Sequence, residues 1–235
     1  MTDPSDAFAS AFALAAAFDG TLLQIVGLSL RTSLAAVLIA CLIGMPLGAL
    51  LATARFPGRG ALTVAVSALM GLPPVVAGLA VYLALSASGP FGPLRLLYTP
   101  AAMVIAQAVL VTPIIAALTR ETVAALNEEY DEYLRSLNAG PAFRLGTLLW
   151  DARFMLTTAA LAGLGRALAE VGAVMIVGGN IAHATRVMTT AIALETSKGE
   201  LALALALGGV LVALSVLIHG ALFALRGRAE ARALA

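Results

Sequence analysis

The sequence predicts an all-α protein that crosses a membrane several times. Hydrophobic residues make up 61% of the 235 residues, and charged residues make up only 11%. A soluble domain has about 25% charged residues, so this chain has too few of them to cover a surface that faces water. Its hydrophobic residues also collect in long stretches without charge, which is the pattern of membrane-spanning helices. We therefore expect a single polytopic membrane domain over residues 1–235.

Five of these stretches are long enough to span a bilayer. A bilayer core of about 30 Å needs about 20 helical residues, because each residue adds about 1.5 Å. The lengths and the Leu and Ala content favour helices over barrel strands of about ten alternating residues. The predicted spans lie near residues 22–53, 62–86, 99–121, 154–178 and 201–225.

The first predicted span is longer than one crossing needs. Residues 21–54 would form a helix of about 50 Å, whereas the bilayer core measures about 30 Å. Gly44, Pro46 and Gly48 lie within it. Glycine permits close helix contact and proline bends a helix, so we expect a kink or a close contact with another helix there. A direct contact with a transported substrate is the alternative.

The N-terminal segment lacks the features of a secretory signal. No Lys or Arg precedes Arg31, and a cleavable signal begins with positive charge. Residues 7–18 are apolar but too short to cross the bilayer. We expect them to form a helix that lies in the interface and contacts membrane lipid.

The basic residues predict the orientation, because they collect on the cytoplasmic side of membrane proteins. Of the 14 basic residues, nine flank the spans on one side and three on the other. We therefore expect the N-terminus outside and the C-terminus in the cytoplasm. The nine are Arg55, Arg59, Arg120, Arg135, Arg144, Arg153, Arg226, Arg228 and Arg232, and the three are Arg95, Arg186 and Lys198.

Prolines interrupt two of the predicted spans. Pro73 and Pro74 lie in the second span, and Pro113 lies in the third. Each proline removes a backbone donor and frees a carbonyl group. Paired breaks in facing helices would shape a central gate, with Thr112 and Ser67 as nearby polar groups. Simple bends in the helices are the alternative.

The fourth span carries two ionisable side chains. Arg166 and Glu170 are four residues apart, so on one helix face they can neutralise each other. Charged residues at membrane depth usually face a bundle interior or a water-filled cavity. Two interpretations stay open: a structural ion pair, or an arginine that lends positive potential to an anion pathway. Asn180, after this span, either lines the outer mouth of that pathway or forms a turn.

The longest predicted cytoplasmic segment, residues 120–153, contains a helix-turn-helix. Its first half is acidic and amphipathic, and residues 138–141 (Asn-Ala-Gly-Pro) break the helix. Leu134, Leu137 and Phe143 give apolar contacts on the two short helices. Either this hairpin lies solvated on the membrane, or its apolar residues dock into a groove of a partner protein.

Several functions are excluded by the sequence. It contains no phosphate-binding loop of the form Gly-x-x-x-x-Gly-Lys-Ser/Thr, so the chain is not expected to hydrolyse ATP. His183 and His219 have no cysteine or carboxylate at metal-ligand spacing, so neither a metal nor a cofactor is expected. No nucleophile–base pair indicates a catalytic site. A net charge of +1 does not favour nucleic-acid binding, and the single cysteine, Cys41, cannot form an intrachain disulfide.

The cytoplasmic segment resembles the signature loop of binding-protein-dependent ABC importer permeases. That signature reads Glu-Ala-Ala, three residues, Gly, nine residues, Ile-x-Leu-Pro. Glu132 takes its first position, Asn138 takes the Gly position, and residues 148–151 fall where the signature ends. The spacing matches, although Asn replaces Gly and Asp151 replaces Pro. Asn is the next-best residue for a left-handed backbone, so we expect the turn to form.

Other segments are similar to the tungstate and molybdate permeases of this family. Residues 55–59, 72–78 and 165–173 resemble molybdate-type permeases, and residues 149–153, 178–181 and 185–199 resemble the tungstate branch. The resemblance implies a homodimeric permease of the type I importer kind in a bacterial or archaeal inner membrane. It also implies an ATPase dimer on the cytoplasmic side and an oxyanion-binding protein on the outside.

The resemblance further implies transport of tungstate, with molybdate as a second candidate, coupled to the ATPase through residues 126–150. The runner-up is an importer of another oxyanion, such as sulfate or phosphate. A membrane scaffold or biogenesis protein without a pathway is the alternative from another class, and co-purification with an ATPase would argue against it. The expected coupling residues are Glu132, Leu134, Leu137, Asn138, Ala139, Gly140 and Phe143.

Overall fold

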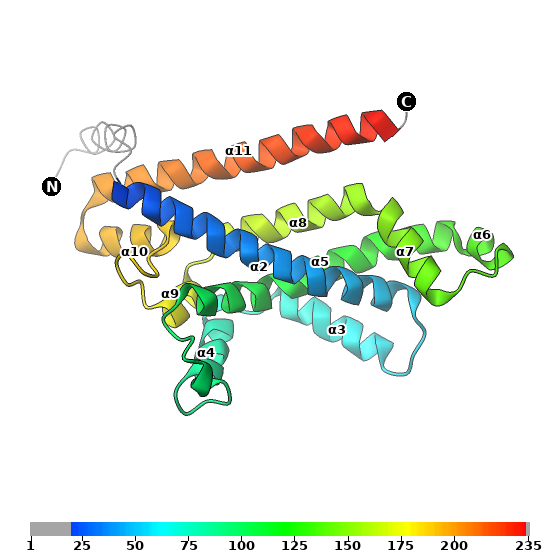
Figure 1. Cartoon of the computed structure of the whole chain (residues 1–235), viewed down its shortest axis with the longest axis horizontal. Helices are drawn as coiled ribbons and strands as arrows, with labels where there is room; N and C mark the ends of the chain where they lie inside the picture. Colours follow the sequence, from blue (N-terminus) through cyan, green and yellow to red (C-terminus); the bar gives the residue numbers. More distant parts are fainter. Residues whose placement is uncertain (1–19, 234–235) are drawn as a thin grey trace. The chain divides into compact units, whose positions relative to one another are not determined.

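The computed structural model describes residues 20–233, and every regular element in that range is helical (Figure 1). The predicted interfacial helix over residues 7–18 lies outside the described residues. The elements are α2 (Gly20–Thr53), α3 (Arg59–Met70), α4 (Pro74–Leu85), the short 3-10 helix η1 (Gly92–Leu94), α5 (Pro100–Glu129), α6 (Asp131–Ser136), α7 (Pro141–Asp151), α8 (Arg153–Leu168), α9 (Gly172–Gly178), α10 (Met188–Lys198) and α11 (Leu201–Ala233).

Three single helices are long and apolar enough to cross a membrane. They are α2, α5 and residues Leu201–Ala221 of α11. Two further pairs, α3 with α4 and α8 with α9, pass the same test together but are bent by 106° and 60°. In chain order these elements correspond to the five predicted spans, each bent pair counting as one. The prediction of an all-α polytopic membrane protein is confirmed.

The bend between α3 and α4 lies at the predicted prolines. Helix α3 ends at Met70, and α4 begins at Pro74. A proline at the first helical position costs little, because its missing N–H would have no helical partner. The prediction of a second proline break was wrong, since α5 continues through Pro113. Val111 and Ile115 are buried on either side of that proline, so packing holds the helix across the missing bond.

The chain folds into two compact units, and each is described by itself. Of the described residues, the first unit comprises residues 20–35, Pro74–Gln107 and Leu168–Ala224. The second comprises Ala36–Pro73, Ala108–Ala167 and residues 225–233. Helices α2 and α5 contribute residues to both units.

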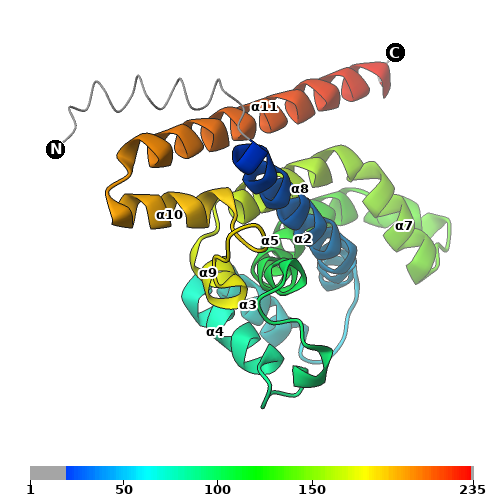
Figure 2. The ribbon, with the colours of Figure 1, turned by 60° about the vertical axis from the view of Figure 1, so that its left-hand side comes forward.

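The first unit is built around a close contact between α4 and α9 (Figure 2). A Cβ atom added to Gly78 of α4 would lie 2.7 Å from the Cα of Ala173 on α9. Only glycine permits this approach, because real Cβ atoms do not come so close to backbone. Leu22, Ala191 and Leu207 form a separate buried cluster in the same unit.

The second unit contains the close contact predicted from Gly44 and Gly48. A Cβ atom on Gly44 would lie 2.9 Å from the carbonyl oxygen of Thr112 on α5. A Cβ atom on Gly48 would collide with the carbonyl oxygen of Ala116 and lie 2.8 Å from Cβ of Thr119. The two glycines, four residues apart on one face of α2, therefore let the backbones of α2 and α5 touch.

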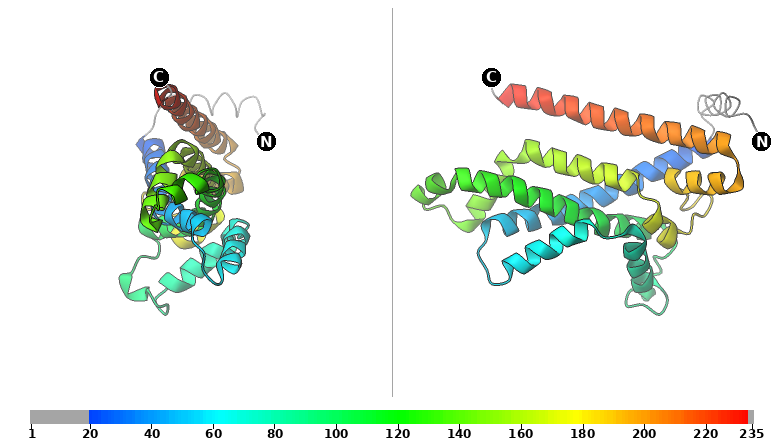
Figure 3. Two further views of the ribbon diagram at one scale, coloured as in Figure 1. Left: turned by 90° about the vertical axis from the view of Figure 1, so that its right-hand side faces the viewer. Right: turned by 180° about the vertical axis from the view of Figure 1, so that it is seen from behind.

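A second core in this unit lies where five helices meet. Its buried members come from the end of α2 and from α5, α6, α7 and α8. It fixes the two short helices that follow α5, which Figure 3 shows turning back beyond the end of that helix. The members are Ala49, Ala52, Val123, Leu134, Leu148, Ala152 and Leu156.

Candidate functional site

Helix α6 ends in a left-handed turn at Asn138, where φ is +49°. The N–H of Asn138 donates to the carbonyl of Arg135 at 2.9 Å, and the N–H of Ala139 donates to the carbonyl of Leu134 at 3.0 Å. This pair of bonds closes a helix whose next residue is left-handed, a place usually taken by glycine. Asn tolerates that conformation better than most side chains. The turn expected from the signature spacing is therefore formed, with Asn in the glycine position.

The second short helix starts directly after this turn. Gly140 is extended, with φ −66° and ψ 158°, and Pro141 is the first residue of α7. Proline is favoured there because its fixed φ suits the first helical turn. The predicted helix-turn-helix is thus present as α6 and α7, joined by residues 137–140.

Apolar side chains of this element face outward. Leu137 is 55% exposed and Phe143 is 63% exposed. They line a groove of about 680 Å³ together with Tyr133, which is 66% exposed. Glu129 and Asp151 also line the groove, and Glu132, which precedes Tyr133 in the chain, is exposed. Exposed apolar residues around a groove, with a charged neighbour, have the character of a docking surface.

Leu134 does not belong to that exposed surface, and its prediction as a docking contact was wrong. Its side chain is only 2% exposed and packs with Val123 and Leu148 in the core. Residues three apart share a face within a helix, but α6 ends at Ser136, between Leu134 and Leu137, so the two side chains need not face the same way. Leu134 therefore anchors α6 to the unit and is not available to a partner protein.

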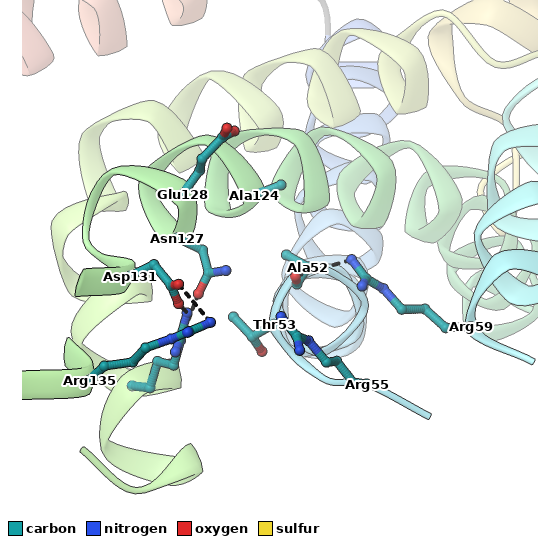
Figure 4. A pocket seen from close by; sticks show the side chains of 10 residues that line it. Ala52, Thr53, Arg55, Arg59, Ala124, Asn127, Glu128, Asp131 and Arg135 are labelled. Carbon is teal, nitrogen blue, oxygen red and sulfur yellow. Dashed lines mark hydrogen bonds and ion pairs between the residues drawn. The ribbon is translucent and has the colours of Figure 1, made fainter. Parts of the chain in front are cut away.

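A charged network ties α5, α6 and α7 together (Figure 4). The guanidinium of Arg144 donates to Asp131 at 2.5 Å and to the Oδ1 atom of Asn127 at 2.7 Å. Arg135 also pairs with Asp131, at 2.8 Å. The hydrogen bond from Arg144 and the charges of both arginines hold the pKa of Asp131 below its ordinary value. The position of α7 relative to α6 is therefore fixed by charge as well as by the apolar core.

Arg166 and Glu170 do not share one helix, so the expected placement on one helix face was wrong, whereas the pairing of their charges stays a prediction. Helix α8 ends at Leu168, and Glu170 lies in the break before α9. The Oε1 atom of buried Glu170 accepts a hydrogen bond from the N–H of Ala173 at 3.0 Å. The N–H groups at a helix start need acceptors, and a buried carboxylate supplies one here. Glu170 therefore helps to start α9.

Asn180 forms part of a tight turn after α9. Gly179 and Asn180 both have left-handed backbones, with φ of +71° and +50°. The Nδ2 atom of Asn180 donates to the carbonyl of Thr190 at 3.2 Å, which fixes the turn against α10.

Thr112, another predicted pathway residue, lies on α5. Its hydroxyl donates to the carbonyl of Ala108, one turn earlier in the same helix, at 2.6 Å.

Two of the predicted pathway positions, Pro74 and Glu170, lie close together within the first unit. Gly172, two residues after Glu170, contacts Val75, which follows Pro74: a Cβ atom on Gly172 would lie 3.1 Å from Cγ2 of Val75. The starts of α4 and α9 therefore adjoin. Pro73, Thr112 and Arg166 belong to the second unit. Over residues 20–233, no cluster of His, Cys, Asp and Glu side chains has the arrangement of a metal site.

Several curated proteins are similar to the chain over most of its length, although no protein-family model matches it. A tungstate uptake system permease protein of Peptoclostridium acidaminophilum is 36% identical over 222 residues, 94% of this chain and 97% of the relative. A probable anion ABC transporter permease protein of Haloferax volcanii is 37% identical over 82% of this chain and 85% of the relative. A molybdenum transport system permease protein of Azotobacter vinelandii is 30% identical over 78% and 85%.

The chain is a permease subunit of an ABC importer for oxyanions. As a member of this family, the permease is a multi-pass membrane protein that works with an ATPase and a binding protein. ATP is hydrolysed by the partner ATPase, so the permease is not itself an enzyme. The helix-turn-helix is its one pair of short helices between α5 and α8 within the described residues.

Three residues of the permease that organise this element were not among the predicted site residues. Asn127, Asp131 and Arg144 lie on three different helices, and Asp131 and Arg144 are 13 residues apart. Helical periodicity pairs residues three or four apart, so it cannot detect such a network. The available signal was an acidic residue at the start of one short helix and a basic residue on the next, across a predicted turn.

Proposed function

We propose that the permease carries tungstate into the cytoplasm, with molybdate as a second substrate. The observation that carries this proposal is the identity to a tungstate uptake permease along nearly the full length of both chains. A second tungstate uptake permease, from Campylobacter jejuni, is 37% identical over 150 residues. Molybdate is included in the proposal because the molybdenum permease is 30% identical to the chain, and because molybdate and tungstate are both tetrahedral dianions.

The proposed assembly is a homodimer of the permease, surrounded by lipid, with the N-terminus outside and the C-terminus in the cytoplasm. The predicted cytoplasmic side carries nine basic residues and the outer side three, which supports this orientation. If each bent pair crosses once, the number of crossings is five, and an odd number agrees with termini on opposite sides. Reporter fusions should show Gly140 and Ala235 in the cytoplasm and Gly92 outside. A cytoplasmic reporter at Gly92 would refute the orientation.

The helix-turn-helix of residues 126–150 is the proposed link to the ATPase. ATP is hydrolysed on another chain, so a rigid element must carry the motion to the membrane helices. Leu137 and Phe143 are the proposed apolar contacts, Glu132 is the charged contact, and Ala139 and Gly140 form the tip. The apolar core and the Arg144 network make this element rigid, which supports the role.

The proposed pathway uses the two bent pairs. The breaks at Pro73–Pro74 and before α9 interrupt helices at membrane depth, where freed backbone groups are usually found only beside a cavity or inside protein. In this proposal Arg166 and Thr112 supply positive potential and polarity to the anion pathway, and Asn180 is a third candidate contact of the anion. A weakly binding pathway suits an anion that must also leave it.

Transport by the reconstituted complex tests the substrate. The permease, its cognate ATPase and the binding protein are reconstituted in liposomes, and tungsten uptake is measured by mass spectrometry with ATP inside. Uptake of tungstate should exceed that of sulfate and phosphate, and molybdate should compete. Tungstate-stimulated ATPase activity with no tungsten uptake, or uptake of sulfate instead, would contradict the substrate.

A further inference from the structure

A polar pocket lies beside the helix-turn-helix, within the second unit (Figure 4). Its volume is about 420 Å³, in the range of small-molecule sites, about 300–1,000 Å³. The end of α2 and the start of α3 form one side, and α5, α6 and α7 form the other. Four arginines line it: Arg55, Arg59, Arg135 and Arg144.

Positive charge exceeds negative charge in this pocket. The pocket is lined by two acidic residues, Asp131 and Glu128, and by four arginines. Asp131 is already neutralised, because Arg135 and Arg144 both pair with its carboxylate. Figure 4 shows the carboxylate of Glu128 pointing away from the other side chains. An anion in the pocket therefore meets an excess of cationic groups.

Two arginines of the pocket have fixed roles, and a third is free. Arg59 donates to the carbonyl groups of Leu51 and Ala52 at 2.7 and 3.2 Å, which closes the end of α2. Arg144 is engaged with Asn127 and Asp131. Arg55 is exposed and makes no ion pair or hydrogen bond with any other residue of the described part of the chain. Its five N–H donors are available to a ligand.

Asn127 presents a donor to the same space. Its Oδ1 atom accepts from Arg144, so its NH₂ group must point the other way. Figure 4 shows that nitrogen on the side of Asn127 that faces Ala52 and Thr53. Arg135, whose side chain is 63% exposed, adds further N–H groups from α6. Donors from the loop after α2, from α5 and from α6 thus line one space.

We propose that this pocket binds a tetrahedral oxyanion of the phosphate class through Arg55, Arg135 and Asn127. Such a group only accepts hydrogen bonds when it is ionised, and arginine is its preferred partner in proteins. The anion is either free in solution or the headgroup phosphate of an anionic lipid. Bound there, it joins the end of α2 to the helix-turn-helix and stiffens that connection. The site is separate from the proposed pathway residues, and the proposal does not depend on the transported substrate.

Thermal unfolding and calorimetry of the purified full-length permease test the site. The protein is held in dodecyl maltoside and titrated with sodium phosphate, with sodium chloride at equal ionic strength as the reference. Phosphate should raise the unfolding temperature more than chloride does. Arg55→Gln should weaken phosphate binding by about tenfold or more, the size of one lost charge-assisted hydrogen bond. Arg55→Lys should retain most of the binding.

Arg95→Asn is the matched control, because Arg95 is an exposed arginine outside the pocket. Asn suits its left-handed backbone, with φ of +50°. This variant should bind phosphate as the unmodified permease does. Equal stabilisation by phosphate and chloride, or full phosphate binding by Arg55→Gln, would overturn the proposal.

Nanodiscs distinguish the two sources of the anion. If phosphatidylglycerol discs abolish the response to free phosphate and phosphatidylcholine discs do not, a lipid headgroup occupies the pocket. If both kinds of disc keep the response, the ligand is a free anion. Loss of the response on adding the ATPase alone would assign the pocket to an acidic side chain of that partner and refute the proposal.

Discussion

Arg144 of α7 donates to the carboxylate of Asp131, the first residue of α6, at 2.5 Å. This bond joins the start of α6 to the first turn of α7, across the turn of the helix-turn-helix. It lowers the pKa of Asp131, and the charges of Arg135 and Arg144 act in the same direction. Because folding lowers this pKa, the ionised carboxylate stabilises the helix-turn-helix at neutral pH, and this stabilisation is lost in acid.

We expect Asp131→Asn to lower the unfolding temperature of the permease most at neutral pH. A carboxyl whose pKa is lowered by folding contributes stability above its ordinary pKa, about 4, and loses it as pH falls through the folded value. The gap between the variant and the unmodified permease should therefore narrow below about pH 4. Thermal unfolding in detergent between pH 3 and 7 measures the gap. A gap that is constant over this range would contradict the role of the ionised carboxylate.

Leu134 and Leu137 should respond differently to the same substitution. Leu134→Ala removes a fully buried side chain and should destabilise the permease by about 2–5 kcal/mol. Leu137→Ala changes an exposed residue, so its effect on stability should stay within about 0.5 kcal/mol. Affinity for the ATPase should instead fall, by about 2 kcal/mol if Leu137 is a central contact. Unfolding curves and ATPase pull-down measure the two effects, and normal pull-down with Leu137→Ala would argue against the docking surface.

Asn138 should tolerate glycine but not valine. Its φ of +49° costs a β-branched residue about 1–2 kcal/mol, whereas glycine adopts it freely. Asn138→Val should therefore lower the unfolding temperature and coupled transport, and Asn138→Gly should leave both near the level of the unmodified permease. Similar behaviour of the two variants would mean that the left-handed turn is not required.

Gly48 and Gly208 form a matched pair of helical glycines. A Cβ atom on Gly48 would collide with the backbone of α5, whereas one on Gly208 of α11 meets no atom within 4 Å. Gly48→Ala should destabilise by about 1–3 kcal/mol through overpacking. Gly208→Ala should be neutral or stabilise by up to about 1 kcal/mol, since alanine favours a helix. Comparable unfolding temperatures of the two variants would show that α2 and α5 are not held at backbone contact.

The helix-turn-helix was predictable because its signals are local. A left-handed residue at position 138 and a proline at position 141 end one helix and start the next, whatever surrounds them. The apolar stretches were predictable for a similar reason, because transfer into a bilayer depends on the composition of each segment. Neither signal shows which side of a short helix packs inward. Leu134 and Leu137 are equally apolar in the sequence, and only the core formed by α2, α5, α7 and α8 distinguishes them.

By itself, the sequence determined the class of protein, the order of its helices, the break at Pro73–Pro74 and the turn at Asn138. Each of these follows from the composition or backbone preference of neighbouring residues. The tertiary structure decided that α5 continues through Pro113, that Glu170 caps α9, and that Arg144 joins Asp131 and Asn127. These outcomes depend on partners far apart in the chain or on packing that offsets a local cost. A contact between residues far apart in the chain produces no helical periodicity in the sequence, so it is seen only in the folded structure.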